Sequence, residues 1–148
     1  MEDITDEVVV AASPEHVWQA IADPVAHAEW HPFLTHIAGG HALGSTRTCD
    51  VRVGKKPGRT EERCSTYDEG RRITWSIDQD STGFSRMVSG WTAGFSLEPQ
   101  GSHATRVVAE STFTPTKLFS RLMLPMIRRK FHKTQQSILT GLKQYMEK

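Results

Sequence analysis

The chain has 148 residues, with 18 lysines and arginines against 17 aspartates and glutamates, so its formal net charge at neutral pH is +1. This length is enough for a substantial hydrophobic core, and we expect residues 1–148 to form a single domain. The near-balance of charge lacks the global positive field that favours nucleic acids, so no nucleic-acid partner is expected.

The hydropathy pattern and the number of cysteines indicate the cellular compartment. Residues 1–7 are acidic and contain no apolar core of a signal peptide. No apolar stretch approaches the roughly 18 residues that cross a bilayer, so stable membrane insertion is not expected. Two cysteines are too few for a disulfide framework, which fits a reducing compartment. We therefore expect a cytoplasmic protein.

The first forty residues predict a strand followed by two short helices. Three consecutive valines within residues 4–12 indicate the strand. Ser13-Pro14 and Asp23-Pro24 each pair an N-cap residue with a proline suited to the first helical position. The second helix is expected to end at Trp30, and residues 35–38 to form a brief strand.

The middle of the chain predicts long strands joined by short turns. Apolar and polar side chains alternate over residues 47–53, 60–67, 73–77, 87–97 and 107–113. Pro57-Gly58 predicts a type II turn over residues 55–58. Consecutive strands with short connections form antiparallel meanders.

Two cysteines flank the predicted turn almost symmetrically. This placement puts Cys49 and Cys64 on one face of adjacent strands, with their Cβ atoms within about 8 Å of each other. We expect free thiols that act as small buried hydrophobes. The spacing shows no cysteine–histidine arrangement of the kind a nucleophile needs.

The last third of the chain predicts one long amphipathic helix. Thr114-Pro115 has the signature of a helix start, and apolar side chains recur at helical spacing as far as Tyr145. Pro125 lies inside this pattern, so a kink is expected there. The apolar stripe of the helix and the apolar face of the sheet would bury each other. The fold class is therefore α+β, with about six to seven antiparallel strands in a curved sheet wrapped around the long C-terminal helix.

Residues 27–31 contain two histidines and a glutamate, which are possible metal ligands. His27-Ala28-Glu29-Trp30-His31 has the order H-x-E-x-H, which differs from the H-E-x-x-H of zinc proteases, and Pro32 ends the helix at once. His36 and His41 are the nearest further candidates for the three converging ligands that zinc requires. Surface histidines are the simpler interpretation, so we expect neither a metal nor a cofactor.

Five segments, in this order, carry a resemblance that covers essentially the whole chain: Ser13-Pro14-Glu15-His16-Val17-Trp18, Trp30-His31-Pro32, Gly44-Ser45-Thr46-Arg47, Tyr67-Asp68-Glu69-Gly70-Arg71-Arg72-Ile73-Thr74-Trp75 and Leu142-Lys143-Gln144-Tyr145-Met146-Glu147. On these the chain resembles the SRPBCC (START-like, helix-grip) superfamily, close to its bacterial polyketide cyclase/dehydrase-like and lipid-transport branch. The resemblance implies a cavity between sheet and C-terminal helix that binds an apolar or aromatic small molecule, with His31 near its rim. It carries over no catalytic motif, so the catalytic residues are unknown.

The candidate ligand-binding residues are bulky or polar groups expected on the inner faces of the sheet and the helix: Trp30, Arg47, Cys49, Cys64, Trp75, Met87, Trp91, Phe95, Met123 and Ile127. Strand parity also turns Glu62, Ser89 and Ser111 inward. Arg47 then has two alternative roles. It orients a ligand carboxylate or enolate, or it is paired with Glu62 as a satisfied ion pair.

Three classes of function remain open. The expected one is binding or transport of a hydrophobic small molecule, such as a lipid, a polyketide or another aromatic ligand. The alternatives are a cyclase/aromatase-type enzyme acting in the same cavity and a protein-interaction module. Lys117, Arg121, Arg128-Arg129-Lys130 and Lys133 make the outer face of the last helix basic, which indicates a solvated face or a weak contact with an anionic membrane. The sequence does not determine the oligomeric state.

Overall fold

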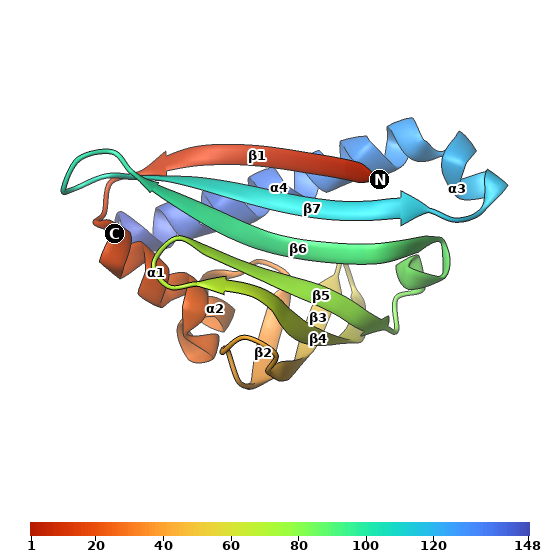
Figure 1. The fold of residues 1–148 in the computed structure, drawn as a ribbon, viewed down its shortest axis with the longest axis horizontal. Helices are drawn as coiled ribbons and strands as arrows, with labels where there is room; N and C mark the ends of the chain where they lie inside the picture. Colours follow the sequence, from red (N-terminus) through yellow and green to blue (C-terminus); the bar gives the residue numbers. More distant parts are fainter.

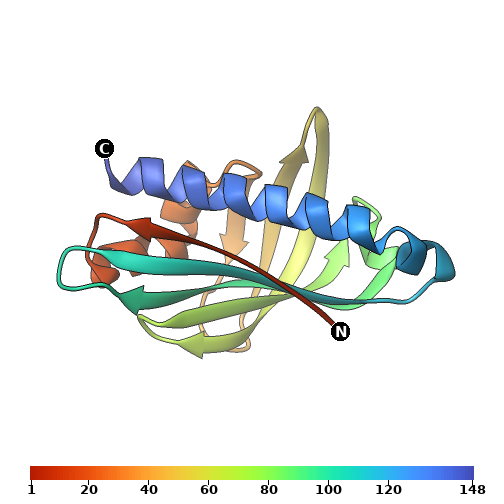
Figure 2. The ribbon, with the colours of Figure 1, turned by 90° about the horizontal axis from the view of Figure 1, so that it is seen from above.

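Seven antiparallel strands form one curved sheet that holds the long C-terminal helix in its concave face (Figures 1 and 2). A computed structural model describes residues 1–148, apart from the side chain of Val53. The elements in chain order are β1 (Glu2–Val10), α1 (Pro14–Ala22), α2 (Pro24–Trp30), β2 (Leu34–Gly39), β3 (Thr46–Val53), β4 (Lys56–Asp68), β5 (Arg72–Asp80), the 3₁₀ helix η1 (Phe84–Arg86), β6 (Val88–Pro99), β7 (Thr105–Pro115), α3 (Leu118–Leu122) and α4 (Leu124–Met146). The predicted α+β helix-grip fold is confirmed.

The strand order β1-β7-β6-β5-β4-β3-β2 follows from the short connections, except that β1 joins the far edge beside β7. Helix α4 packs mainly on β1 and β7 at that edge. Figure 2 shows the hairpin of β3 and β4 crossing α4 in this view and extending past it. The main contacts of α4 are thus confined to the β1–β7 side of the sheet.

Capping explains the two short helices. The Ser13 hydroxyl oxygen accepts a hydrogen bond from the His16 amide at 3.4 Å. Asp23 ends α1 through its own amide and begins α2, because its carboxylate accepts a hydrogen bond from the Val25 amide at 3.0 Å. Trp30 at the end of α2 is anchored to α1 by an indole hydrogen bond of 2.7 Å to the carbonyl of Ala20. Both predicted helix starts are therefore confirmed.

The turn between β3 and β4 lies two residues earlier than predicted. Residues 54 and 55 form it, with Gly54 at a φ of +64°, and Pro57-Gly58 already belongs to β4. This shift changes the register, so Cys49 pairs with Thr60. Cys64 lies on the same sheet face but four residues further along, about 13 Å away at the usual strand rise. The predicted Cβ separation of about 8 Å is wrong, while the shared face is confirmed.

A bulge alters the inner face of β6. The register of β6 against β7 shifts between Ser89 and Thr92, and Gly90 adopts a φ of +61° there. A bulge of this kind places two residues opposite one and reverses the alternation. Ser89 is therefore exposed rather than turned inward as predicted, and Met87 lies before the strand in the η1 segment.

The C-terminal helix also begins differently. Thr114-Pro115 completes β7, where Thr114 pairs with Ser89, because ladder pairing prevails over the helix-start signal. The helical region is divided into α3 and α4 at Met123, whose ψ of 3° is not helical. Pro125 lies in the first turn of α4, where its missing N–H costs nothing. The irregularity predicted at Pro125 is therefore present as a break just before it, whereas the predicted continuous helix from Thr114-Pro115 is wrong.

None of the helices in the described residues is sufficiently long and apolar to cross a bilayer.

Candidate functional site

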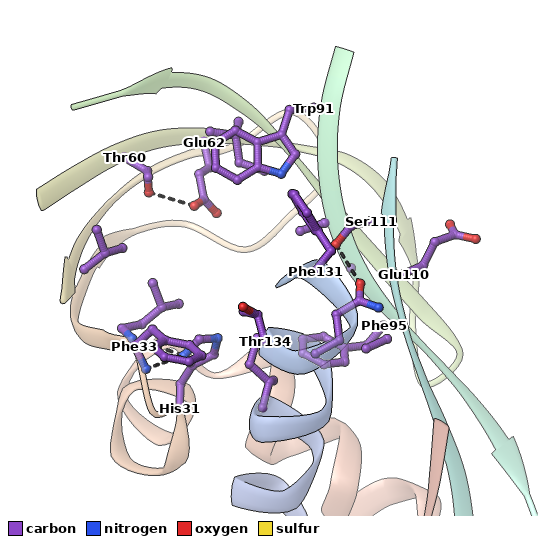
Figure 3. A pocket seen from close by; sticks show the side chains of 18 of the residues that line it. His31, Phe33, Thr60, Glu62, Trp91, Phe95, Glu110, Ser111, Phe131 and Thr134 are labelled. Atoms are coloured by element: carbon purple, nitrogen blue, oxygen red, sulfur yellow. Dashed lines mark hydrogen bonds between the residues drawn. The ribbon is translucent and has the colours of Figure 1, made fainter. Parts of the chain in front are cut away.

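A cavity of about 240 Å³ lies between the concave face of the sheet and α4 (Figure 3). Its walls come from the end of α2 and the segment after it, from the inner faces of β3 to β7, and from the middle of α4. Most of the lining is apolar, for example Leu34, Ile77, Phe95 and Ile138. A few polar groups interrupt this surface, which is the composition of a small-molecule site.

The first polar group is a buried ion pair across β3 and β4. Nε and Nη2 of Arg47 lie 3.0 and 2.8 Å from the same carboxylate oxygen of Glu62, and both side chains are less than a tenth exposed. The other carboxylate oxygen accepts a hydrogen bond of 2.7 Å from Thr60. The guanidinium carbon lies 3.7 Å from the ring centre of Trp75. Arg47 is thus fixed from two sides, and the expected ion pair with Glu62 is present.

Two histidines of α2 and its C-cap form the second polar group. Nδ1 of His27 lies 2.8 Å from the carbonyl oxygen of Ile21, so this nitrogen carries the proton and Nε2 is an acceptor. Nδ1 of His31 instead accepts from the amides of Phe33 and Leu34, both at 3.1 Å, which leaves the proton on Nε2. The two rings stack with 5.2 Å between their centres. One imidazole therefore offers an acceptor and its neighbour a donor.

Both imidazoles are uncharged at neutral pH. Burial, with a smaller contribution from the positive charge of Arg47, lowers the pKa of His27 to about 3. Burial also holds the pKa of His31 well below its ordinary value, and His27 and Arg47 act in the same direction. The donor and acceptor roles given by the hydrogen bonds are therefore stable over the physiological range.

Aromatic side chains from η1, β6, β7 and α4 pack together beside the cavity. Trp91 packs edge-on against Phe84 with ring centres 4.9 Å apart, and Phe113 stacks on Phe131 at 4.9 Å. Trp91 and Phe131 reach the cavity wall. Within the described residues the buried indole N–H of Trp91 has no hydrogen-bond partner. The residue therefore contributes its ring area rather than a hydrogen bond to the fold.

A polar seam holds α4 above the sheet. Ser111 donates to the amide oxygen of Gln135 at 2.7 Å, and the amide nitrogen of Gln135 donates to Asp6 at 2.8 Å. The same Asp6 oxygen lies 2.9 Å from Nδ1 of His132. Gln135 is only 3% exposed and lines the cavity, so its two partners fix the position of the helix at this point.

The structure brings three of the ten candidate residues, Arg47, Trp91 and Phe95, to the cavity wall. Trp75 lies behind Arg47, and Trp30 packs against Phe95 from outside the wall. The other five lie further away: Cys49 with Leu34 and Ile37, Cys64 in the main core, and Met87, Met123 and Ile127 towards the α3 end of the molecule. The ligand-binding role of all ten stays a prediction.

Sequence parity placed Glu62 and Ser111 correctly on the wall, while Ser89 lies away from it because of the bulge. Pattern reasoning missed His27, Phe131, Thr134, Gln135 and Ile138 as wall residues. The sequence signal for His27 was its four-residue spacing from His31, which places both side chains on one face of a helix that ends before Pro32. Glu110 also borders the cavity, but its side chain points outward in Figure 3 and pairs with Arg72.

Neither cysteine has the character of a nucleophile. Burial, reinforced by the charge of Glu62, raises the pKa of the Cys49 thiol to about 12. Burial likewise raises the pKa of Cys64. Both thiols are free and stay protonated at neutral pH. In the described part of the chain, no three histidine, cysteine or carboxylate side chains converge in a way that could hold a metal ion.

The comparisons with known proteins agree with this architecture. The family described as polyketide cyclase / dehydrase and lipid transport matches residues 1–147. A START superfamily protein from Mycobacterium smegmatis is 18% identical, with a TM-score of 0.80 over 98% of this chain and 97% of its own. Zhui aromatase/cyclase from Streptomyces sp. R1128 is 16% identical, with a TM-score of 0.77 over 99% of this chain and 93% of its own.

A larger protein contains the same fold. The di-domain ARO/CYC BexL from the BE-7585A biosynthetic pathway is 15% identical, with a TM-score of 0.85 over 99% of this chain and 47% of its own. At such identities the structural likeness establishes the fold alone. Among curated proteins, no sequence matches this chain.

Proposed function

Because the chain belongs to the polyketide cyclase / dehydrase and lipid transport family, we propose that its cavity binds a compact, uncharged molecule with one or two rings and a polar oxygen. The observation that carries the proposal is the pairing of an apolar cavity with a charge-neutral polar end. Arg47, Glu62, His27 and His31 form that polar end.

Cavity size supports a compact ligand. The volume of about 240 Å³ lies below the roughly 300–1,000 Å³ typical of drug-sized sites. A long acyl chain would need a deeper space. The aromatic side chains Phe95, Trp91 and Phe131 on the walls suit ring faces and edges.

Charge balance supports an uncharged ligand. Glu62 neutralises Arg47 at 2.8 Å, and both histidines are held neutral by burial. A carboxylate entering this end would add a buried negative charge without a counter-ion, which is costly. A carbonyl or phenol oxygen can instead accept from the Nε2–H of His31, and a phenol O–H can donate to Nε2 of His27. Recognition of a neutral oxygen by the histidines therefore takes the place of carboxylate recognition by Arg47.

The test compares 2-naphthol with 2-naphthoate and palmitate by isothermal titration calorimetry at neutral pH. We expect 2-naphthol to bind at least about tenfold more tightly than either anion, the factor that corresponds to 1.4 kcal/mol. Thr134→Trp should abolish binding, because Thr134 points into the cavity from α4 (Figure 3). The matched control Thr140→Trp places the same ring on an exposed site of α4. Unchanged binding to a folded Thr134→Trp protein would exclude this cavity as the site.

A second variant tests the polar end. His31→Phe preserves an aromatic ring but removes the Nε2–H donor, along with the Nδ1 acceptor of two backbone amides, so 2-naphthol should bind about three- to tenfold more weakly in a protein whose folding is verified by circular dichroism. Its affinity for naphthalene, which has no oxygen, should stay the same. Equal losses for both ligands would show that His31 contributes shape and not a hydrogen bond.

The two imidazoles also favour a second candidate function, a cyclase/aromatase-type reaction. Neighbouring neutral histidines, one accepting and one donating, can orient an enol O–H and polarise a carbonyl of a substrate through hydrogen bonds. We would add a linear poly-β-ketone thioester and follow ring formation by mass spectrometry. Turnover that is lost in both His27→Phe and His31→Phe favours the enzyme. Binding without turnover favours the carrier. A stable protein partner, together with a cavity that binds none of the tested small molecules, favours the interaction module.

A further inference from the structure

Exposed apolar side chains gather at one end of the molecule. Eight large hydrophobic residues are strongly exposed, and four of them fall between residues 118 and 126. Leu118, Phe119, Leu122 and Met126 are 72%, 64%, 71% and 62% exposed, and we refer to these four as the α3 patch. Single exposed apolar residues are ordinary on protein surfaces, but a contiguous group of this kind marks an interaction site.

The patch is held firmly on a projecting part of the fold. In Figures 1 and 2, α3 lies beyond the end of β7, at the opposite end of α4 from the C-terminus. The amide of Thr116 donates to the carbonyl of Met87 at 3.1 Å, which ties the preceding segment to η1. Ser120 is fully buried, and its hydroxyl bonds both the amide and the carbonyl of Lys117. The apolar side chains are thus presented outward by an anchored turn.

Positively charged residues flank the patch in the sequence. From Ser111 to Met146 the sequence contains seven lysines and arginines and no aspartate or glutamate. Two of the seven are paired, one with Glu2 and the other with Glu147. Four exposed lysines and arginines lie beside the patch in the chain: Lys117, Arg121, Arg129 and Lys130. Among the described residues, none of these four side chains has a carboxylate within 4.0 Å.

We propose that the α3 patch docks this protein on an anionic lipid surface. Apolar side chains that enter the interface, with lysines and arginines at their rim, match the two attractions that hold peripheral proteins on acidic membranes. A second copy of the chain fits poorly, because two such faces would bring like charges together. The patch is a projecting helical turn rather than a groove, so a deformable surface suits it better than a rigid protein partner. The proposal is independent of what the cavity binds.

The test is flotation of the purified protein with vesicles of phosphatidylcholine alone or with about 30 mol% phosphatidylglycerol. We expect binding to the anionic vesicles only, weakened several-fold when salt rises from about 0.1 M to about 0.5 M. The double variant Phe119→Ser/Leu122→Ser should lower the partition coefficient at least about tenfold. The matched control Val25→Ser/Leu43→Ser removes two apolar residues that are 70% and 65% exposed elsewhere, and should bind as the wild type does.

Separate readouts distinguish this proposal from ligand binding. Phe119→Ser/Leu122→Ser should still bind 2-naphthol, and Thr134→Trp should still float with anionic vesicles. The docking proposal is overturned by equal binding to both kinds of vesicle, or by an undiminished partition of the Phe119→Ser/Leu122→Ser protein. It is also overturned if ultracentrifugation shows a dimer that this variant abolishes, or if an acidic protein partner requires the patch while anionic vesicles do not bind.

Discussion

His27 should make the protein sensitive to acid. The side chain is 3% exposed, and burial, followed by the nearby charge of Arg47, lowers its pKa from 6.5 to about 3. In the unfolded chain the same imidazole takes up a proton near pH 6.5. Between these two values the unfolded state binds more protons than the folded state. The free energy of unfolding must therefore fall as the pH falls through this window.

The magnitude follows from the two pKa values. Lowering the pH from about 7.5 to about 5 should remove roughly 2 kcal/mol of stability through His27 alone, and reaching pH 4 should remove roughly 3 kcal/mol. His31 acts in the same direction, since its pKa is also lowered by burial. A loss of this size is a large part of the stability of an ordinary domain.

Urea unfolding followed by tryptophan fluorescence at pH 7.5 and pH 5 measures the effect. His27→Asn should be less stable than the wild type at pH 7.5, because the ring stacking is lost, but its further loss at pH 5 should be smaller by about 2 kcal/mol. His16→Asn, at an exposed position of α1, is the matched control and should show the wild-type loss. Equal losses in all three proteins would refute the idea that a buried neutral His27 governs acid stability.

Three further outcomes follow from the packing, each measured by urea unfolding. Arg47→Met should cost about 3–5 kcal/mol because it leaves Glu62 buried without its partner, and adding Glu62→Gln should recover much of this loss; no recovery would contradict a coupled pair. Trp91→Phe should change stability by less than about 1 kcal/mol, since its indole N–H has no partner among the described residues; a larger loss would reveal a hidden interaction. Leu142→Asp should cost several kcal/mol at a fully buried site, whereas Thr140→Asp on the exposed side should be nearly silent, and similar stabilities would refute the assigned helix face.

Helix caps and the alternation of apolar residues were correctly predicted from the sequence, because neighbouring residues alone determine them. Ser13 and Asp23 cap helices because their side chains can satisfy free amides, whatever the rest of the chain does. Ile73, Trp75 and Ile77 alternate with less apolar residues and are all buried on the inner face of β5. The sheet, the long helix and their mutual burial were therefore predictable.

Errors arose where pairing with a distant strand decides the outcome. Pro57-Gly58 has good turn chemistry, yet Gly54 takes the turn, and a two-residue displacement moved the partner of Cys49 by four residues. The sequence around Gly90 did not predict a bulge, although this bulge determines which face of the sheet Ser89 and Trp91 occupy. Thr114 has a helix-start signature that ladder hydrogen bonds to β6 override.

The cavity wall depends on the same long-range contacts, because Gln135 lies in a polar run that predicts a solvated helix face. In the structure it is buried between Ser111 and Asp6 and holds α4 at a fixed height over β7 and β1. On the other side of the cavity, Arg47 is immobilised by Glu62 and by the face of Trp75. Apolar surfaces with nothing between them tend to collapse, but these supports are satisfied hydrogen-bonded groups that would lose their partners if the helix moved inward. The space is therefore maintained by the protein itself, and a ligand can enter it without first separating packed layers.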